Sequence, residues 1–120
     1  LIGGVLMDIN AEAEKSLLKT GCSVVFQYPR SFTRLPVISF YTLKEYGAVA
    51  YDNHEAVREG TIVADIWART PKKCAEISEK VRTVMNNDGW TELFAADIPR
   101  GSADIYHRSM RLVKSFYTDN

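Results

Sequence analysis

The sequence contains few of the cysteines and histidines from which chemical sites are commonly built. Its only cysteines are Cys22 and Cys74, and two thiols in a chain of this size do not make a disulfide scaffold. We therefore expect both to be reduced, as in an intracellular protein. His54 and His107 lie far apart, and together with the cysteines they show none of the spacings that bind zinc. No metal site is expected.

Motifs for nucleotide binding and nucleophilic catalysis are also missing. Gly3-Gly4 is not part of a GxGxxG or GxxxxGK[ST] loop, so nothing supports phosphate binding. Cys74 falls on the apolar stripe of a predicted helix and is a poor nucleophile, whereas a pairing of Cys22 with His107 as its base stays open. We expect no enzymatic activity and no cofactor. The candidate paired carboxylates are expected to be solvated charges: Asp52, Glu55, Glu59 and Asp65.

The sequence has no excess of charge of either sign. Lys+Arg and Asp+Glu both number 15, so the formal net charge is zero and no bulk field attracts nucleic acid or an anionic membrane. Arg108, Arg111 and Lys114 leave contact with a phosphate backbone as a minor alternative. No apolar run is long enough to span a bilayer, and residues 1–6 lack the basic leader of a signal peptide. We expect residues 1–7 to be disordered or vector-derived.

Two segments have the composition and the end signals of helices. Asp8 or Asn10 can cap a helix over residues 11–19, which Gly21 would end. Thr70-Pro71 supplies a cap and a first-turn proline for a second helix. The apolar side chains of this second helix recur at intervals of three and four residues: Cys74, Ile77, Val81, Val84 and Met85.

β-Branched and aromatic residues predict strands between the two helices and after the second one. There is no repeat and no Pro-, Gly- or Ser-rich linker, so we expect one domain over residues 1–120. The predicted fold class is α+β, an antiparallel or mixed sheet with both helices packed on one face, in the order α-β-β-β-α-β-β. The predicted strands are residues 23–28, 37–43, 61–68, 90–98 and 105–116, with a further short piece at 48–51.

The face of the sheet turned away from the helices is expected to contact another polypeptide. In the strand 61–68 the small and aliphatic even-numbered residues suit the helix side, so Val63, Asp65 and Trp67 point to the other side. Large aromatic and arginine side chains on a mixed face are typical of protein interfaces. Trp67 could instead be covered by the segment Tyr46–Asn53. The candidate subunit contacts are Trp67, Arg69, Arg108 and Arg111.

Four stretches of the sequence form a recognisable combination within the span from about Asp8 to Phe116. They are Tyr28-Pro29, Leu35–Phe40, Ile62–Ala68 with the helix behind it, and Tyr106–Leu112. The most specific parts are the D-I-W strand and the Y-H-R-x-x-R strand. Together the stretches resemble the small proteins that complete the tails of long-tailed bacteriophages and prophages, which are called tail terminator, tail completion or head-to-tail joining proteins.

The resemblance implies an α/β subunit that forms a ring, usually hexameric, on the end of the finished tail tube. Such a ring stops tube growth and presents a surface to a head completion or connector protein, and DNA passes through its centre. The implied partners are the chain itself, the tail tube protein and that head protein, and no cofactor is implied. The implied location is the virion tail, after assembly in the host bacterial cytoplasm. Candidate loops for tube and head contacts are residues 30–35, 46–59 and 99–104.

A second class of function stays open, a small-molecule-binding or catalytic α+β domain that dimerises through its sheet. A deep apolar pocket that held Cys22, His107 and Asp65 together would favour this class. A flat or convex subunit with aromatic and arginine side chains on the sheet would favour the assembly role.

Overall fold

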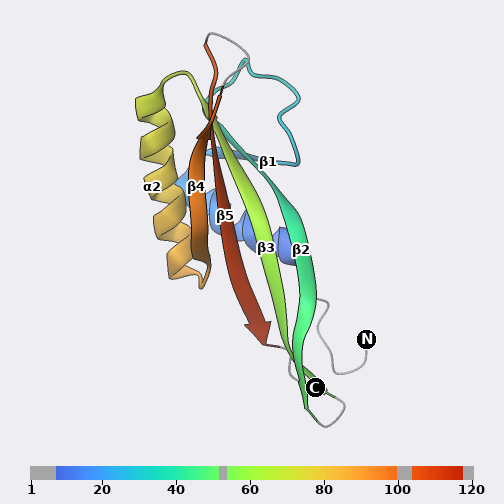
Figure 1. Ribbon diagram of the computed structural model, residues 1–120. Coiled ribbons are helices and arrows are strands. Elements are labelled where there is room, and N and C mark those ends of the chain that lie inside the picture. Colours follow the sequence, from blue (N-terminus) through green and yellow to red (C-terminus); the bar gives the residue numbers. More distant parts are fainter. Residues whose placement is uncertain (1–7, 52–53, 100–103, 118–120) are drawn as a thin grey trace.

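The computed structural model describes residues 8–51, 54–99 and 104–117. These residues form two α-helices, one 3₁₀ turn and a five-stranded mixed sheet in the order α-β-β-β-α-β-β. Both helices contribute to one hydrophobic core with the same face of the sheet. The predicted α+β class is therefore confirmed (Figure 1).

The first helix, α1, spans Ile9–Leu17, two residues earlier than the composition predicted. Its N-cap is Asp8, whose side chain accepts a hydrogen bond from a backbone N–H of the first turn at 3.0 Å. A 3₁₀ turn, η1, continues the helix over Leu18–Thr20. It ends at Gly21, whose φ of 81° lies in the left-handed region that glycine adopts without strain.

The second helix, α2, spans Pro71–Asn87 and begins and ends close to the predicted residues. The Thr70 hydroxyl accepts a hydrogen bond from the backbone N–H of Lys73 at 3.1 Å, which confirms the cap, and Pro71 occupies the first turn. The apolar stripe faces the sheet as predicted, because its members are buried apart from the half-buried Val84: Cys74, Ile77, Val81 and Met85.

The sheet has the strand order β1-β2-β3-β5-β4, so β1 and β4 form its two outer edges. β1 runs parallel to β2, and every other pair of neighbours is antiparallel. The strands are β1 (Ser23–Phe26), β2 (Val37–Tyr51), β3 (His54–Ala68), β4 (Thr91–Ile98) and β5 (Tyr106–Tyr117).

The centre of β3 divides between the two faces as the alternation predicted. The even-numbered residues from Ile62 to Ala68 are fully buried in the core that both helices share. Gly60 continues this row, and Ile9 of α1 packs directly against it. The helices therefore cover one face of the sheet, which we call the helix face, and leave the opposite face, which we call the open face.

The strands β2 and β3 are longer than the sequence predicted. The segment 46–59, expected to be a polar contact loop, instead consists largely of paired strand, since Tyr46 pairs with Glu59 and Tyr51 with His54. Register shifts beside Leu43 and around residues 47–50 let the pairing continue past Gly47. The short piece at 48–51 is thus the end of β2, and residues 52–53 and 100–103 of the expected contact loops lie outside the described part of the chain.

The molecule is elongated, with principal extents of 55 × 24 × 23 Å and a Cα radius of gyration of 15.9 Å. A compact chain of this length would have a radius of about 13.6 Å. The excess comes from β2 and β3, which run on beyond the helices (Figure 1); the end of β5 accompanies them as far as Val57, and beyond it only two strands remain in the described part of the chain. We call the segment in which residues 45–51 pair with residues 54–60 the hairpin arm.

Candidate functional site

The open face is closed by the protein's own chain at the end where β3 leads into α2. Trp67 is only 7% exposed there, although it points away from both helices. Tyr28 and Phe32, from the segment between β1 and β2, pack on its ring with centroid distances of 5.2 and 5.1 Å. On its other side His107 stacks at 3.7 Å. Trp67 therefore has little surface left for a neighbouring subunit, contrary to the interface expected from the sequence.

The segment that covers Trp67 is also different from the one considered in the sequence analysis. The residues of β2 from Tyr46 onward pair with β3 from Glu59 backward. Glu59 lies eight residues from Trp67, or about 26 Å along an extended strand. The cover comes instead from residues 27–36, which cross the open face between the parallel strands β1 and β2.

Polar side chains beneath this cover are paired with one another. The Asp65 carboxylate lies 2.7 Å from Nε2 of His107, and the Trp67 indole N–H donates to the Ser39 hydroxyl at 3.0 Å. Asp65 is 8% exposed and Ser39 is fully buried. These bonds satisfy groups that would otherwise be costly to bury, which suggests a structural role for the cluster.

The Asp65–His107 pair could serve as a base, but the predicted thiol is not beside it. Cys22 precedes β1 at the far edge of the sheet and packs against the core on the helix face. His107 lies on β5, three strands away, or about 14 Å. The buried Cys74 lies on α2, and burial raises the pKa of its thiol, which disfavours the reactive thiolate. Neither cysteine therefore forms a nucleophile–base pair with His107.

The three predicted arginine contacts lie in different places. Arg111 is exposed on the open face, with its guanidinium 4.9 Å from the ring centroid of Phe94. Arg69 is exposed and donates to the backbone carbonyl of Phe32 at 3.4 Å. Arg108 points to the helix face and not to the open face, since strand alternation sets it opposite Arg111.

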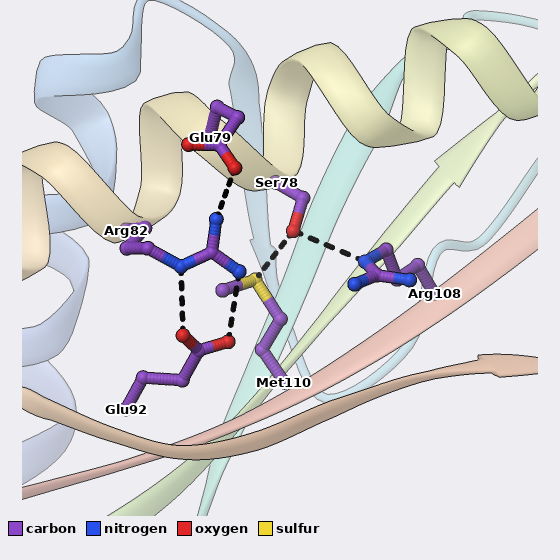
Figure 2. Close-up of polar contacts among 6 residues, drawn as sticks. All are labelled: Ser78, Glu79, Arg82, Glu92, Arg108 and Met110. Atoms are coloured by element: carbon purple, nitrogen blue, oxygen red, sulfur yellow. Dashed lines mark hydrogen bonds and ion pairs between the residues drawn. The ribbon is translucent and has the colours of Figure 1, made fainter.

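Arg108 helps to hold α2 on the sheet, as Figure 2 shows. Its guanidinium donates to the Ser78 hydroxyl at 3.1 Å and to the Asp97 carboxylate at 3.0 Å. A second guanidinium, that of Arg82, donates to both oxygens of Glu92 on β4 at 2.7 and 3.0 Å, and also contacts Glu79. The placement of Arg108 on the open face, on which its predicted subunit contact rested, is therefore wrong, and the contact itself stays a prediction.

Two hollows on the described part of the surface do not gather the residues of a catalytic site. A groove of about 410 Å³ between η1 and α2 is lined by Lys19, Glu79 and Val84 among others. Another, of about 560 Å³, lies beside β1. Neither includes Cys22, Asp65 or His107. Among the described residues no three His, Cys, Asp or Glu side chains lie close enough to hold a metal ion, and no described helix has the length and apolarity needed to cross a membrane.

Exposed large apolar side chains concentrate instead at the two outer edges of the sheet. On the β4 edge, Leu93 is 55% exposed and is flanked by exposed neighbours. The opposite edge is formed by β1 and by the part of β2 that extends past it. Seven of the nine large apolar side chains that are exposed among the described residues lie at these edges, and the other two, Leu18 and Tyr117, lie on η1 and at the end of β5. The seven are Leu93, Phe94 and Ile98 on the first edge, and Phe26, Tyr28, Leu43 and Tyr46 on the second.

These edge residues were not identified from the sequence, although their strands were. Leu93 and Leu43 each stand at a register shift, so simple alternation does not assign them to a face. Their exposure also depends on which strands end up at the edges, and strand order is a property of the whole sheet. The sequence gives one indication of the exposed β4 residues: the apolar run in β4 is longer than a single buried face requires.

No protein-family model matches this chain, and no curated protein is significantly similar to it.

Proposed function

We propose that this chain is a structural subunit of a long-tailed bacteriophage or prophage particle, which assembles as a ring on the end of the tail tube and joins the tail to the head. The observation that carries the proposal is the exposure of large apolar side chains on both outer edges of one sheet. Such side chains rarely gather on a surface that has no partner. The proposed partners are further copies of the chain, the tail tube protein and a head completion or connector protein.

Exposed apolar side chains on two opposite edges favour a repeating assembly over a symmetric dimer. When each subunit binds the opposite edge of its neighbour, a row of subunits forms, and each end of the row keeps one unbound edge. Such heterologous contacts close into a ring when the rotation between copies allows it. DNA would pass through the opening, and the subunit itself would hold no cofactor.

The elongated shape also suits a cap. The hairpin arm extends the molecule to 55 Å, whereas the two edges that would contact neighbouring copies lie beside the helix-covered part of the sheet. An arm outside the ring contacts is free to reach the last ring of tube subunits. It would then occupy the surface that another tube subunit needs, and growth of the tube would stop.

A catalytic or small-molecule-binding role is the second candidate, and the Asp65–His107 pair is the observation in its favour. The cover of Tyr28 and Phe32 over Trp67 leaves this pair in a packed environment. The variant His107→Asn distinguishes a catalytic or binding role of this pair from a structural one. Loss of stability without loss of particle assembly would fit a structural pair in an assembly subunit.

The proposed function is tested by removing the gene from the phage or prophage that carries it. We expect tails of irregular, extended length without heads, seen by negative-stain electron microscopy, and recovery when the chain is supplied in trans. Purified chain added to growing tubes of the tail tube protein from the same genome should shorten them. Tails of normal length that carry heads in the deletion strain would refute the proposal.

A further inference from the structure

We propose that β4 of one copy docks against the β1 edge of the next copy, in a head-to-tail contact with a basic and an acidic side. We define the β4 edge as residues 91–98, and the β1 edge as residues 25–36, which include the end of β1 and the segment that follows it. The inference rests on the proposed function in taking the partner to be a second copy of this chain. It adds the surfaces that meet and the polarity of the contact.

Both edges expose apolar side chains, and one of them is hollowed. A hollow of about 560 Å³ lies at the β1 edge, lined by Val25, Phe26, Gln27, Tyr28 and Arg30. Phe26 and Tyr28 are 50% and 59% exposed beside it. The β4 edge offers projecting apolar side chains of matching chemistry, since Leu93 is 55% and Ile98 40% exposed. Burying such groups in a neighbour's hollow removes apolar surface from water.

The charges of the two edges are opposite. Residues 91–98 contain Glu92 and Asp97 and no basic residue. Glu92 is bound by the Arg82 guanidinium, so the exposed carboxylate of this edge is that of Asp97. Residues 25–36 contain Arg30 and Arg34 and no acidic residue, which gives +2. Both arginines are exposed, and the Asp97 side chain is 81% exposed despite its bond to Arg108. A symmetric contact of β4 with β4 would place the exposed Asp97 on an edge that has no basic residue, whereas the β1 edge offers Arg30 and Arg34, so charge favours the head-to-tail arrangement.

The register of the sheet sets the two edges at the same level. Following the pairing across the strands, Phe26 of β1 and Ala95 of β4 lie on one row of residues. The rows that end in Ser23 and in Ile98 also coincide. Four strand spacings, or about 19 Å, separate the two edges. A rotation about an axis roughly along the strands therefore brings the edge of one copy to that of the next, which permits closure. The row through Phe26 is Phe26, Phe40, Ala64, Met110 and Ala95.

Two variants that each disable one edge test the proposal. Leu93→Lys with Ile98→Lys cancels the negative formal charge of the β4 edge and makes the edge less apolar. Arg30→Glu with Arg34→Glu makes the β1 edge acidic. All four side chains are exposed, so folding should be retained, which circular dichroism checks. Self-association is measured by sedimentation velocity from about 10 μM to about 1 mM.

We expect the native chain to associate and each variant to associate at least about tenfold more weakly. An equimolar mixture of the two variants should form a complex with equal numbers of each, because one variant keeps a native β4 edge and the other a native β1 edge. A native chain that stays monomeric at about 1 mM overturns the proposal. So does a mixture that forms no complex. Dimers of the β1-edge variant alone would show a symmetric β4 contact and would also overturn it.

Matched controls place the same charge changes on the helix side. Leu18→Lys with Thr83→Lys adds two positive charges at exposed positions, and Lys72→Glu with Lys80→Glu reverses two exposed lysines of α2. Both should associate like the native chain. The outcome is separable from the proposed function. If the purified chain associates head to tail but the deletion strain makes normal tails, the contact is supported and the role in the tail is refuted. If the purified chain stays monomeric but the deletion strain makes tails of irregular length, the role in the tail is supported and the contact is refuted.

Discussion

Gly60 lies on the helix face of β3, where α1 approaches the sheet most closely. A Cβ atom at this position would come within 2.5 Å of Cδ1 and 2.9 Å of Cγ2 of Ile9. The Ile9 side chain is 2% exposed and belongs to the core, so it has little room to withdraw. The lack of a side chain at Gly60 therefore determines how α1 sits on the sheet.

We predict that Gly60→Ala lowers the free energy of unfolding by about 1–3 kcal/mol through overpacking. The measurement is urea unfolding of the single variants and of the double variant with Ile9→Ala. In the Ile9→Ala background the cost of Gly60→Ala should shrink, because the clashing atoms are gone. Equal costs in the two backgrounds would contradict the proposed contact.

A second prediction concerns the ion pair between Arg82 of α2 and Glu92 of β4, drawn in Figure 2. Hydrogen bonds from Arg82 lower the pKa of the Glu92 carboxyl below its ordinary value of 4.5. A carboxyl with a lower pKa in the folded chain stabilises the fold above its ordinary pKa and loses that effect as pH falls through its folded pKa. Glu92→Gln should therefore cost about 1 kcal/mol at neutral pH.

The pH dependence separates this ion pair from other acid-sensitive groups. The stability difference between the native chain and Glu92→Gln should narrow progressively below pH 4.5, as followed by thermal unfolding at several pH values. Lys19 and Ser16 similarly lower the pKa of Asp88, but that contribution is common to both proteins and cancels. A difference that stays constant down to pH 3 would show that Glu92 is not stabilised by charge.

At the level of single residues, the sequence predicted what depends on neighbours in the chain. The caps Asp8 and Thr70 and the stop at Gly21 act within one turn of their own helix, so local rules identify them. The position of Arg108 follows from strand alternation, yet its bond to Ser78 requires knowing where α2 lies. The cover of Trp67 by Tyr28 and Phe32 joins residues about 35–39 apart in sequence.

Among the elements, the segment 27–36 is the one that changes the interpretation of the open face. We predict that Phe32→Ala uncovers Trp67, because Phe32 packs on its ring at 5.1 Å. Acrylamide should quench the tryptophan fluorescence of this variant more strongly than that of the native chain, whose two tryptophans are 7% and 1% exposed. Leu18→Ala, an exposed change on η1, is the control. Unchanged quenching would mean that the cover does not depend on Phe32.

The hairpin arm should be the least protected part of the sheet in an isolated subunit. At the tip of the arm, where residues 50–51 pair with residues 54–55, only two strands are present among the described residues, because β5 pairs with β3 no further than Val57. Two-stranded ribbons are marginally stable. We predict that amide hydrogens in the pairing of Tyr51 with His54 exchange much faster than those of Ile62 and Ile66, measured by hydrogen-exchange NMR. Comparable protection in the two regions of a monomer would contradict this. Protection of the arm only after addition of tail tube protein would support the proposed capping contact.

The full length of β2 and β3 could not be predicted because the usual strand-ending signals are tolerated here. Gly47 lies inside β2, and register shifts on either side absorb it. The charged run from Glu55 to Glu59 suggested a loop, but a strand outside the core has no need of apolar alternation. The core strands, by contrast, were predictable because burial imposes a clean pattern on residues 62–68.

For the whole molecule, salt provides a test of the proposed edge contact. If the opposite charges of the β1 and β4 edges contribute, raising the ionic strength from about 0.05 to 0.5 M should weaken self-association, since screening lengths fall well below 10 Å. Sedimentation equilibrium at both ionic strengths measures the effect. The variant Arg30→Glu with Arg34→Glu should show the opposite trend, because salt relieves its repulsion. Salt-independent association of the native chain would restrict the contact to apolar packing.

The overall class of the fold was predictable, whereas the edges that we propose for assembly were not. Element types and their order follow from local patterns, and they led to the α+β class. The order β1-β2-β3-β5-β4, and the parallel placement of β1, decide which apolar side chains remain at the edges. Leu93 and Phe26 look like ordinary core residues until the sheet has been assembled around them.

Helices packed on one face alone make every copy two-sided. In a closed wall of copies joined edge to edge, all the α2 helices would line one surface and all the bare strands the other. The inside and the outside of such a wall would then differ in chemistry without any further specialisation of sequence. The different inner and outer surfaces of the ring would both follow from the fact that, in each subunit, the helices cover only one side of the sheet.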